Sequence, residues 1–278
     1  MQHQSEKKFV EWSECITLRH HNVRCVARLL NTRNNGALKG LDVGGGVGTF
    51  ASHVCTLVSG CQITVIDKSS LARDGFVANP GLRFEEADFL SMDETTRYDF
   101  IIMKTVLHHF IGEGETETRA NQLAALEKAR RLLKPDGLLL IEENFYEDFF
   151  GKDLIGRFIL ALTQPRLLEP LIRRLGANTA GEGVRFRSLH GWKDLFAESG
   201  LEIDTLEKSP TWGTDFPLWQ RLPLLCKQRF QAVLSLRRVP ALALQPVIER
   251  TWGKVRKTAA AIAALSTLAL VIYREAEA

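Results

Sequence analysis

The glycine-rich segment 41–50 constrains the fold of this chain more than any other feature. A short apolar run stops there in a cluster of glycines, which are Gly44, Gly45, Gly46 and Gly48. A helix-compatible run, Thr49–Val58, follows at once, so the order predicts a strand, a sharp turn and a helix. Glycines let the backbone contact a ligand while it turns. Asp42 adds a carboxylate, which suits a cationic or hydroxyl-rich ligand and repels a pyrophosphate.

Strands and helices alternate beyond this turn. We expect strands at Leu38–Val43, Gln62–Ile66, Leu82–Glu86, Tyr98–Met103 and Leu138–Ile141, with helices between them at Thr49–Val58, Ser69–Val77 and Glu115–Leu133. This alternation predicts an α/β fold with a parallel sheet and helices on both faces. Ligands bind such sheets beyond the carboxyl ends of the strands. Polar residues stand at those ends, namely Asp42, Asp67, Asp88, Lys104 and Glu142.

Several of these motifs, in this order, resemble the class I S-adenosylmethionine-dependent methyltransferases, specifically the small-molecule group. The resemblance covers about residues 38–206 and rests on Asp42–Gly48, Asp67, Ala87-Asp88-Phe89, Tyr98–Phe110 and Lys134–Ile141. It implies a doubly wound, mostly parallel seven-stranded Rossmann-like sheet and S-adenosylmethionine as the cofactor. The implied cofactor-binding residues are Asp42, Gly44, Gly46, Gly48, Asp67, Asp88, Phe89 and Lys104. In the family, the glycines pass under the methionine part, Asp67 matches the acid on the ribose, and Asp88-Phe89 matches the adenine segment.

The chemistry of the acidic residues agrees with this cofactor. S-adenosylmethionine carries a sulfonium cation, ribose hydroxyls and a neutral adenine, so its site needs hydrogen-bond acceptors more than phosphate donors. A dinucleotide enzyme is the rival, because residues 46–51 fit G-x-G-x-x-A and Asp67 stands where a ribose-binding acid is expected. That reading leaves Asp42, Asp88 and a pair of histidines unexplained. Asp67 as a helix cap and Asp88 as a turn residue are the structural alternatives.

The catalytic candidates are His108 and His109, which follow the fourth expected strand. Methyl transfer is an in-line displacement that depends mainly on alignment of the acceptor. A hydroxyl or amine acceptor can also need a general base, and histidine suits that role near neutral pH. Of the two we choose His109, with packing under the loop as the alternative for either ring. Glu143 and Tyr146 are weaker candidates.

We divide the chain into six segments. They are a helical N-terminal cap (1–36), an S-adenosylmethionine-binding core (37–146), a helical lid (147–188), a return to the core with helix Trp192–Ser199 and strand Leu201–Leu206 (189–208), a basic helical insertion (209–266) and the last strand (267–278). Residues 149–175 carry more apolar side chains than one core face needs, which favours a lid over an apolar acceptor or plain packing on the sheet. The apolar run 259–273 would span ~22 Å as a helix, short of a ~30 Å bilayer core, so we expect a buried strand at Thr267–Tyr273.

Charge and cysteine usage restrict the partners and the compartment. From residue 205 onward there are 11 Lys and Arg against 5 Asp and Glu, so the insertion offers a basic surface for peripheral contact with an anionic membrane or a solvated basic face. No nucleic-acid reader motif is present.

Five scattered cysteines give neither a metal-ligand pattern nor a disulfide framework, and the N-terminus has no apolar signal core. We expect a cytoplasmic protein without a metal; the oligomeric state stays open.

These observations predict methyl transfer from S-adenosylmethionine to a small, hydrophobic acceptor, at oxygen. The prediction that the methyl group goes to an oxygen atom rests on the histidine pair alone. Two alternatives stay open, a catalytically inactive cofactor-binding scaffold and a methyltransferase that acts on a lipid-like substrate at a membrane surface.

Overall fold

The computed structural model describes residue 17 and residues 20–151, 153–174, 179–210 and 226–239. The chain forms two compact units, Met1–Arg238 and Val239–Ala278. The fold reported below is that of the described residues of the first unit. The expected last strand, residues 267–278, lies outside the described residues.

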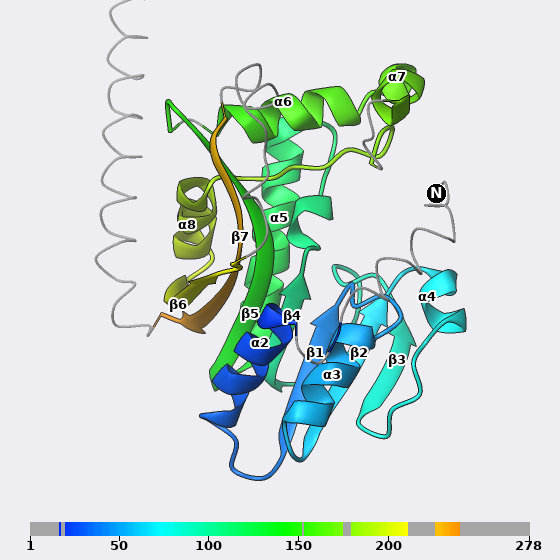
Figure 1. The fold of residues 1–278 in the computed structure, drawn as a ribbon, viewed down its shortest axis with the longest axis vertical. Helices are drawn as coiled ribbons and strands as arrows, with labels where there is room; N and C mark the ends of the chain where they lie inside the picture. The colour runs from blue at the N-terminus through cyan, green and yellow to red at the C-terminus, as the bar shows by residue number, and fades with distance from the viewer. Residues whose placement is uncertain (1–16, 18–19, 152, 175–178, 211–225, 240–278) are drawn as a thin grey trace, which may run out of the picture. The chain divides into compact units, whose positions relative to one another are not determined.

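A seven-stranded sheet forms the centre of the first unit (Figure 1). Its strands are β1 (Leu38–Val43), β2 (Cys61–Asp67), β3 (Leu82–Glu86), β4 (Tyr98–Lys104), β5 (Leu133–Asp148), β6 (Leu201–Lys208) and β7 (Cys226–Arg238). The strand order is β3-β2-β1-β4-β5-β7-β6. Pairs among the first five strands are parallel, whereas β7 is antiparallel to both β5 and β6. The expected doubly wound, mostly parallel sheet is therefore confirmed.

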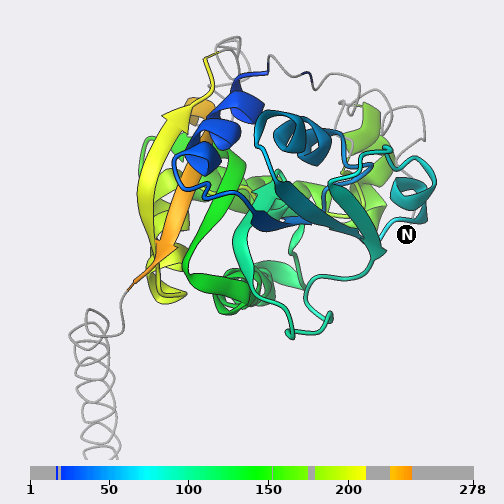
Figure 2. The same ribbon diagram turned by 90° about the horizontal axis from the view of Figure 1, so that it is seen from below.

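Helices cover both faces of this sheet (Figure 2). The helices α2 (His21–Asn31) and α3 (Thr49–Leu57) pack on one face, where the core includes Phe100 and Ile102 of β4. The helices α5 (Gly114–Leu132) and α8 (Leu189–Glu198) pack on the other face, against Ile101 and Met103 of the same strand. Since successive side chains of a strand point to opposite faces, the unbroken apolar run of β4 indicates a strand buried on both sides.

The strand β5 is much longer than the sequence predicts. It begins directly after α5 and runs for 16 residues to Asp148. Between Tyr98 and Phe100 of β4, the paired residues on β5 advance from Leu133 to Leu138, so residues 134–137 bulge out of the ladder. The expected turn Lys134–Gly137 is this bulge. The pairing of β5 with β4 ends at Glu142, whereas its pairing with β7 continues to Asp148. The part of β5 beyond Glu142 carries Glu143 and Tyr146.

The strand β7 corrects the expectation of a helical insertion at residues 226–238, and residues 211–225 and 240–266 of that insertion lie outside the described residues. Cys226–Arg238 is a strand that lies between β5 and β6. Its central residues are buried, with Ala232, Val233 and Leu234 at most 1% exposed. A strand that has neighbours on both edges and is covered on both faces shows no alternation of polar and apolar residues. The sequence therefore contains no strand pattern here, and the arginines near the two ends of the segment suggested a basic helix instead.

The segment between β5 and α8 contains helices. They are α6 (Leu154–Thr163), the short 3-10 helix η2 (Arg166–Leu168) and α7 (Glu169–Arg174). After residue 178 the chain passes through an extended stretch, Val184–Ser188, and enters α8. Two further short helices, α4 (Ser70–Asp74) and η1 (Leu107–His109), follow β2 and β4. In the described part of the chain, no helix is both long and apolar enough to cross a bilayer.

Candidate active site

The glycine turn between β1 and α3 can be formed only by residues without a side chain. Gly44, Gly46 and Gly48 have φ angles of 65°, 56° and 80°, a region that other residues rarely adopt. A Cβ atom on Gly44 would lie 2.5 Å from Cγ2 of Val106, in the loop after β4. The glycine loop is therefore packed directly against the segment that leads to His108 and His109.

Two buried carboxylates, one on β1 and one on β5, lack enough hydrogen-bond donors. Asp42 is 1% exposed, and neither of its oxygens has a hydrogen-bond partner among the described residues. Burial raises the pKa of Asp42 to about 7; Lys104 opposes the shift, and Asp67 and Glu142 add to it. Glu142, at the end of the β4 pairing on β5, is 3% exposed, and its Oε2 likewise lacks a donor in the described part. Such unpaired buried acceptors cost folding free energy, and a ligand that brings donors or positive charge would satisfy them.

Lys104 is the cation nearest to these carboxylates. Its Nζ lies 3.7 Å from Oε1 of Glu142 and 5.8 Å from the centre of the Phe50 ring. His20, which the sequence did not indicate, belongs to the same group. Burial lowers the pKa of His20, Glu142 opposes this shift, and Lys104 adds to it. One lysine thus balances only part of the negative charge of Asp42 and Glu142.

Asp67 ties the glycine loop to the end of β2. Its Oδ2 accepts the Gly46 N–H at 3.1 Å, and its Oδ1 accepts the Ser69 N–H at 2.9 Å, just before α4. Asp67 therefore shapes the turn, and its role toward a ribose remains a prediction. Part of its surface stays accessible, so it can still accept hydrogen bonds from a ligand.

The segment 87–89 lies beside Asp67, because the Ala87 N–H donates to the Asp67 carbonyl at 3.1 Å. Asp88 is exposed, and its Oδ1 accepts the Leu90 N–H at 2.8 Å, as in a turn. Phe89 is only 4% exposed and packs edge-on against Phe110, with ring centres 6.2 Å apart. The structure thus places Asp88 at the surface and the Phe89 side chain in the core. Their roles toward an adenine remain predictions.

His108 forms a buried pair with Glu143. Its Nδ1 lies 2.9 Å from Oε2 and 3.0 Å from Oε1 of Glu143, and the two residues are 6% and 1% exposed. Oε2 of Glu143 also accepts the Asn144 N–H at 3.1 Å. A carboxylate beside Nδ1 fixes the tautomer that carries the proton there, which leaves Nε2 with a free lone pair. The sequence indicated both residues but not that they pair.

His109 lies against His108 but differs in accessibility. The two ring centres are 4.3 Å apart, and His109 is exposed to solvent. Protein nevertheless surrounds it on most sides. The resulting desolvation lowers its pKa well below the ordinary value, and His108 and Lys68 lower it further. His109 is therefore neutral at physiological pH and a weak proton acceptor.

Aromatic rings continue from the histidine pair. Phe186 stacks on His108 with ring centres 4.4 Å apart, and Tyr146 contacts Phe186 at 5.0 Å. Burial raises the pKa of Tyr146, which keeps its hydroxyl protonated. These rings form an apolar surface beside the imidazole of His108.

A cluster of buried charges holds the backbone of Phe186. Arg185, fully buried, binds Glu115 through Nε at 2.6 Å and Asp153 through Nη2 at 2.7 Å. Arg187 donates through Nε to Gln122 at 2.6 Å and lies 3.3 Å from Glu115. Sequence reasoning missed this cluster, since its members are up to 72 residues apart. The alternation of Arg185, Phe186 and Arg187 was the one local signal, because neighbours in an extended chain point opposite ways.

The fold and this site define an α/β protein with a glycine turn and buried acceptors at the carboxyl edge of its sheet. A family model described as a methyltransferase domain matches residues 17–206, which is more than half of the chain. The chain belongs to this methyltransferase family. The resemblance seen in the sequence and the expectation of S-adenosylmethionine as cofactor are confirmed.

Solved structures with the same fold are numerous, although their sequences are distant. Human N-acetylserotonin methyltransferase in complex with S-adenosylmethionine is 20% identical, with a TM-score of 0.52 over 85% of this chain and 57% of that one. CalO1, a methyltransferase in calicheamicin biosynthesis, is 18% identical, with a TM-score of 0.53 and the same coverage. This chain spans about half the length of several of these structures, 49% in one case. No curated protein matches the chain in sequence.

The fold by itself does not determine the reaction. SpnF, a [4+2]-cyclase, is 17% identical, with a TM-score of 0.50 over 77% of this chain and 80% of that one. At such identities the likeness shows the fold alone. The argument for an activity must therefore come from the side chains of the site.

The residues present fit the cofactor of the family. The unpaired oxygens of Asp42 and Glu142 need a partner that brings donors or positive charge. S-adenosylmethionine offers an ammonium group and a sulfonium, and its ribose hydroxyls suit an acid at the position of Asp67. Asp42, Glu142, Asp67 and the glycine loop are therefore the residues that would hold it.

Proposed function

We propose that this protein methylates a small, hydrophobic acceptor at a hydroxyl oxygen, with His108 as general base and Glu143 as its positioning residue. The observation that carries the proposal is the buried His108–Glu143 pair, at 2.9 Å. Val106 packs against the glycine turn, and His108 comes two residues after Val106 in the chain. The pair therefore lies close to the cofactor-binding loop. The bound cofactor supplies an electrophilic methyl group, and the remaining steps belong to this chain.

The pair accounts for activation of a hydroxyl. Glu143 accepts the hydrogen bond from Nδ1 of His108, and Nε2 then removes the proton from the acceptor hydroxyl as the oxygen attacks. The adjacent carboxylate stabilises the imidazolium that forms, as in other carboxylate–histidine pairs. His109 suits this role less well, because its lowered pKa disfavours proton uptake. The geometry thus favours His108 over the His109 that the sequence suggested.

The surroundings support an apolar acceptor. Phe186 and Tyr146 line the approach to His108 with aromatic surface. An apolar wall excludes water, which protects the activated oxygen from solvation and helps to orient the acceptor.

Cofactor binding is the first experiment. Calorimetric titration with S-adenosylmethionine and S-adenosylhomocysteine should give micromolar binding to the wild type. Asp67→Asn should weaken it at least about tenfold, because an amide cannot accept two backbone N–H bonds and ribose hydroxyls equally well. Arg83→Gln, on the exposed edge strand β3, is the matched control and should bind as the wild type does. Absence of binding to a folded wild type would contradict the proposal.

Methyl transfer is then measured with labelled cofactor and a panel of phenols, quinols and fatty acids. His108→Gln and Glu143→Gln should each lower kcat by about 10²–10⁴ with little change in cofactor affinity, and His109→Gln should lower it far less. Binding without turnover of any acceptor would favour the scaffold alternative, and equal losses for both histidines would remove the case for His108.

A further inference from the structure

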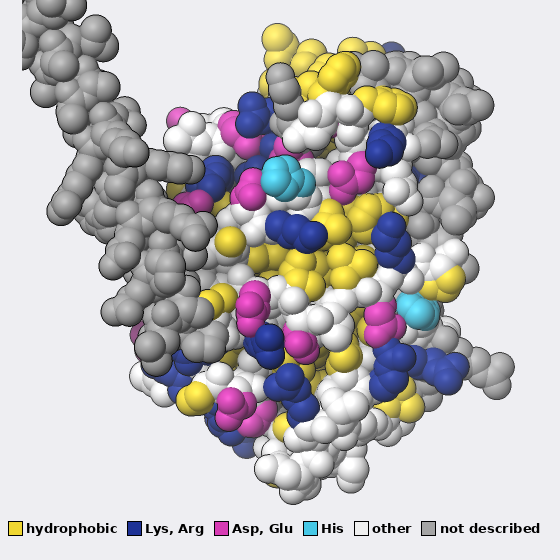
Figure 3. Space-filling model, turned by 90° about the vertical axis from the view of Figure 1, so that its left-hand side faces the viewer, with side chains coloured by type: hydrophobic (Ala, Val, Ile, Leu, Met, Phe, Trp, Pro, Cys, Tyr) yellow, Lys and Arg dark blue, Asp and Glu magenta, His cyan; other side chains and the backbone are white. Residues whose placement is uncertain are grey.

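The lid presents an apolar surface that the described fold leaves uncovered. We call it the lid face; its members are Phe149, Phe150, Leu154, Phe158, Leu167 and Leu171, from 38% to 91% exposed. Leu154 and Phe158 are four residues apart in α6, so they share one side of that helix. Phe149 and Phe150 precede the helix. Figure 3 shows apolar side chains gathered at the upper end of one face of the molecule, above a band in which basic, histidine and acidic side chains are mixed.

The core does not need these side chains. On the opposite side of α6, Ile155 and Leu160 are 2% and 3% exposed. Gly156 also packs inward, so closely that a Cβ would lie 1.8 Å from the carbonyl oxygen of Phe186. The helix α6 is therefore already anchored, and its outer apolar side is available for something else. Apolar patches of this kind mark surfaces that bind a partner or a membrane.

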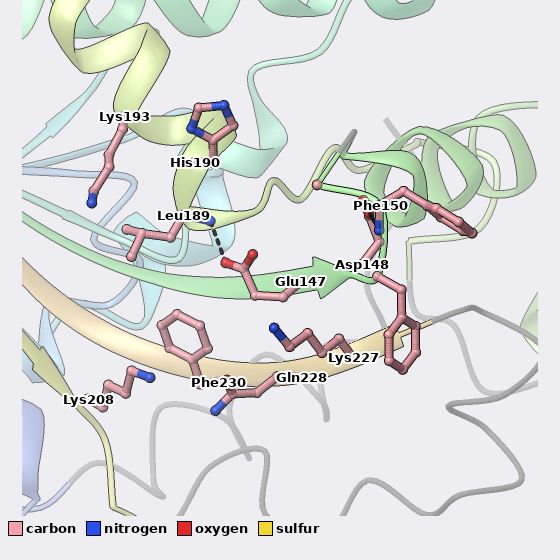
Figure 4. Close-up of a pocket in the computed structure, with 12 residues that line it drawn as sticks. Glu147, Asp148, Phe150, Leu189, His190, Lys193, Lys208, Lys227, Gln228 and Phe230 are labelled. Atoms are coloured by element: carbon pink, nitrogen blue, oxygen red, sulfur yellow. Dashed lines mark hydrogen bonds between the residues drawn. The ribbon is translucent and has the colours of Figure 1, made fainter.

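A basic pocket adjoins the lid face. It has a volume of about 640 Å³ and lies among the end of β5, the start of β7, the start of α8 and the end of β6. Lys193, Lys208 and Lys227 line it together with His190 (Figure 4). Phe149 and Phe150 of the lid face line the same pocket, so the two surfaces are continuous.

The acidic residues of this pocket are engaged with the backbone. Glu147 accepts the Leu189 N–H at 2.8 Å, which holds the start of α8. Asp148 accepts the N–H groups of Phe150 and Leu154 at 2.7 and 2.9 Å. Three lysines against these two carboxylates still leave the pocket lining with a net positive charge, and Arg157, Arg166 and Arg174 of the lid are exposed as well.

We propose that the lid face and the lysine pocket dock on an anionic lipid bilayer. The apolar side chains would enter the interfacial layer, and the lysines and lid arginines would contact the anionic headgroups at its surface. Charge complementarity selects this occupant, because protruding Phe and Leu side chains flanked by Lys and Arg match an anionic interface. This surface shares Lys227 with the basic insertion suggested by the sequence, but most of its residues belong to the lid, α8 and β6. It does not depend on methyl transfer.

Vesicle co-sedimentation of the full-length chain tests the docking. Binding should be strong with vesicles of phosphatidylglycerol and phosphatidylcholine, weak with phosphatidylcholine alone, and reduced when the salt is raised from 0.05 to 0.5 M. The double variant Phe149→Glu/Phe150→Glu and the double variant Lys193→Glu/Lys208→Glu should each weaken partitioning about tenfold or more. All four residues are at the surface or the rim of the pocket, so folding should be retained, which circular dichroism checks.

Matched substitutions at other surfaces are the controls. Leu57→Glu, at the exposed end of α3, and Arg83→Glu, on the edge strand β3 at the other end of the sheet, should bind vesicles as the wild type does. Equal binding by the wild type and both double variants would overturn the proposal and place any membrane contact elsewhere in the chain. No binding to anionic vesicles would also overturn it. A wild-type dimer in sedimentation velocity that Phe149→Glu/Phe150→Glu dissociates, without vesicle binding, would assign the lid face to a second copy.

Discussion

Two groups of buried charges in this protein differ in how they are satisfied. In the cluster around Arg185 and Arg187, every carboxylate has donors, since Glu115 and Asp153 both contact the guanidinium groups and Asp153 also accepts the Ser188 N–H at 2.6 Å. Beneath the glycine turn, Asp42 has no donor among the described residues. Asp153 is buried as Asp42 is, at 9% and 1% exposed, so burial alone does not identify a binding site.

The difference shows how to separate structural charges from functional ones. A buried carboxylate that the fold itself satisfies stabilises the fold, or at least does not strain it. A buried carboxylate that the fold leaves without donors destabilises the free protein and gains free energy when a cationic ligand arrives. The variants below should therefore change stability in opposite directions at the two sites.

The largest expected effect is at the paired cluster. Arg185→Met should lower the free energy of unfolding by about 3–5 kcal/mol, because it leaves the buried Asp153 and the half-buried Glu115 without their main partner. Urea denaturation followed by circular dichroism measures the change. The matched control is Arg237→Met, which removes the exposed Arg237–Glu202 pair and should cost less than about 1 kcal/mol. Equal losses in the two variants would contradict the assignment.

At the unpaired carboxylate Asp42, we expect a substitution to raise the free energy of unfolding. Burial raises the folded-state pKa of Asp42 to about 7, from an ordinary value of 3.8. Its ionisation therefore destabilises the folded state progressively as the pH rises from about 4 to 7, and the full penalty is present above 7. Asp42→Asn should raise the stability of the cofactor-free protein at pH 8 by roughly 1–4 kcal/mol and by much less at pH 5. A destabilised variant at pH 8 would show that Asp42 is satisfied in solution.

Cofactor binding should offset the free-energy cost of ionising Asp42 in the folded protein. A cationic ligand beside Asp42 favours the ionised carboxylate, so S-adenosylmethionine should release up to about one proton when it binds near pH 6.5. Calorimetry in buffers of different ionisation enthalpy measures the protons released. Asp42→Asn should abolish the release and also weaken binding. Proton release that persists in the variant would assign the effect to another group.

The smallest expected effect concerns His109. Its folded-state pKa is lowered, so the unfolded chain takes up a proton before the folded chain does, and stability is lost as the pH falls below about 6.5. His109→Gln should remove a few tenths of a kcal/mol of this loss between pH 7 and pH 5, since the residue is solvent-accessible. Thermal unfolding at the two pH values checks it. A larger pH dependence in the variant would contradict the lowered pKa.

Local patterns were enough to predict the part of the fold that carries the cofactor loop. The strand β1 and the strand β3 have the predicted bounds, because each is a short apolar or alternating run that ends in turn-forming residues. The strand β7 was not predicted, since a strand with neighbours on both edges shows no alternation. The extension of β5 past Glu142 was also missed, because its stability comes from pairing with β7 and not from its own sequence.

The site divides in the same way. The glycines, Asp42 and Asp67 follow one another in a fixed local motif, so their positions could be predicted from spacing. The pairing of His108 with Glu143 could not, because it depends on how far β5 extends beyond β4. The arginine cluster depends on contacts between residues that are distant in sequence and carried by α5, α6 and the segment before α8.

The anchored arginines on either side of Phe186 have a consequence for the evolution of substrate preference. Phe186 lies on His108, while its two neighbours are held by Glu115, Gln122 and Asp153. The backbone at this point cannot shift without breaking several buried ionic contacts. A descendant that accepts a bulkier molecule would gain room more readily by shortening the side chain at position 186 than by moving the loop. If the proposed function holds, saturation mutagenesis of that single codon is therefore the most direct way to change the acceptor range.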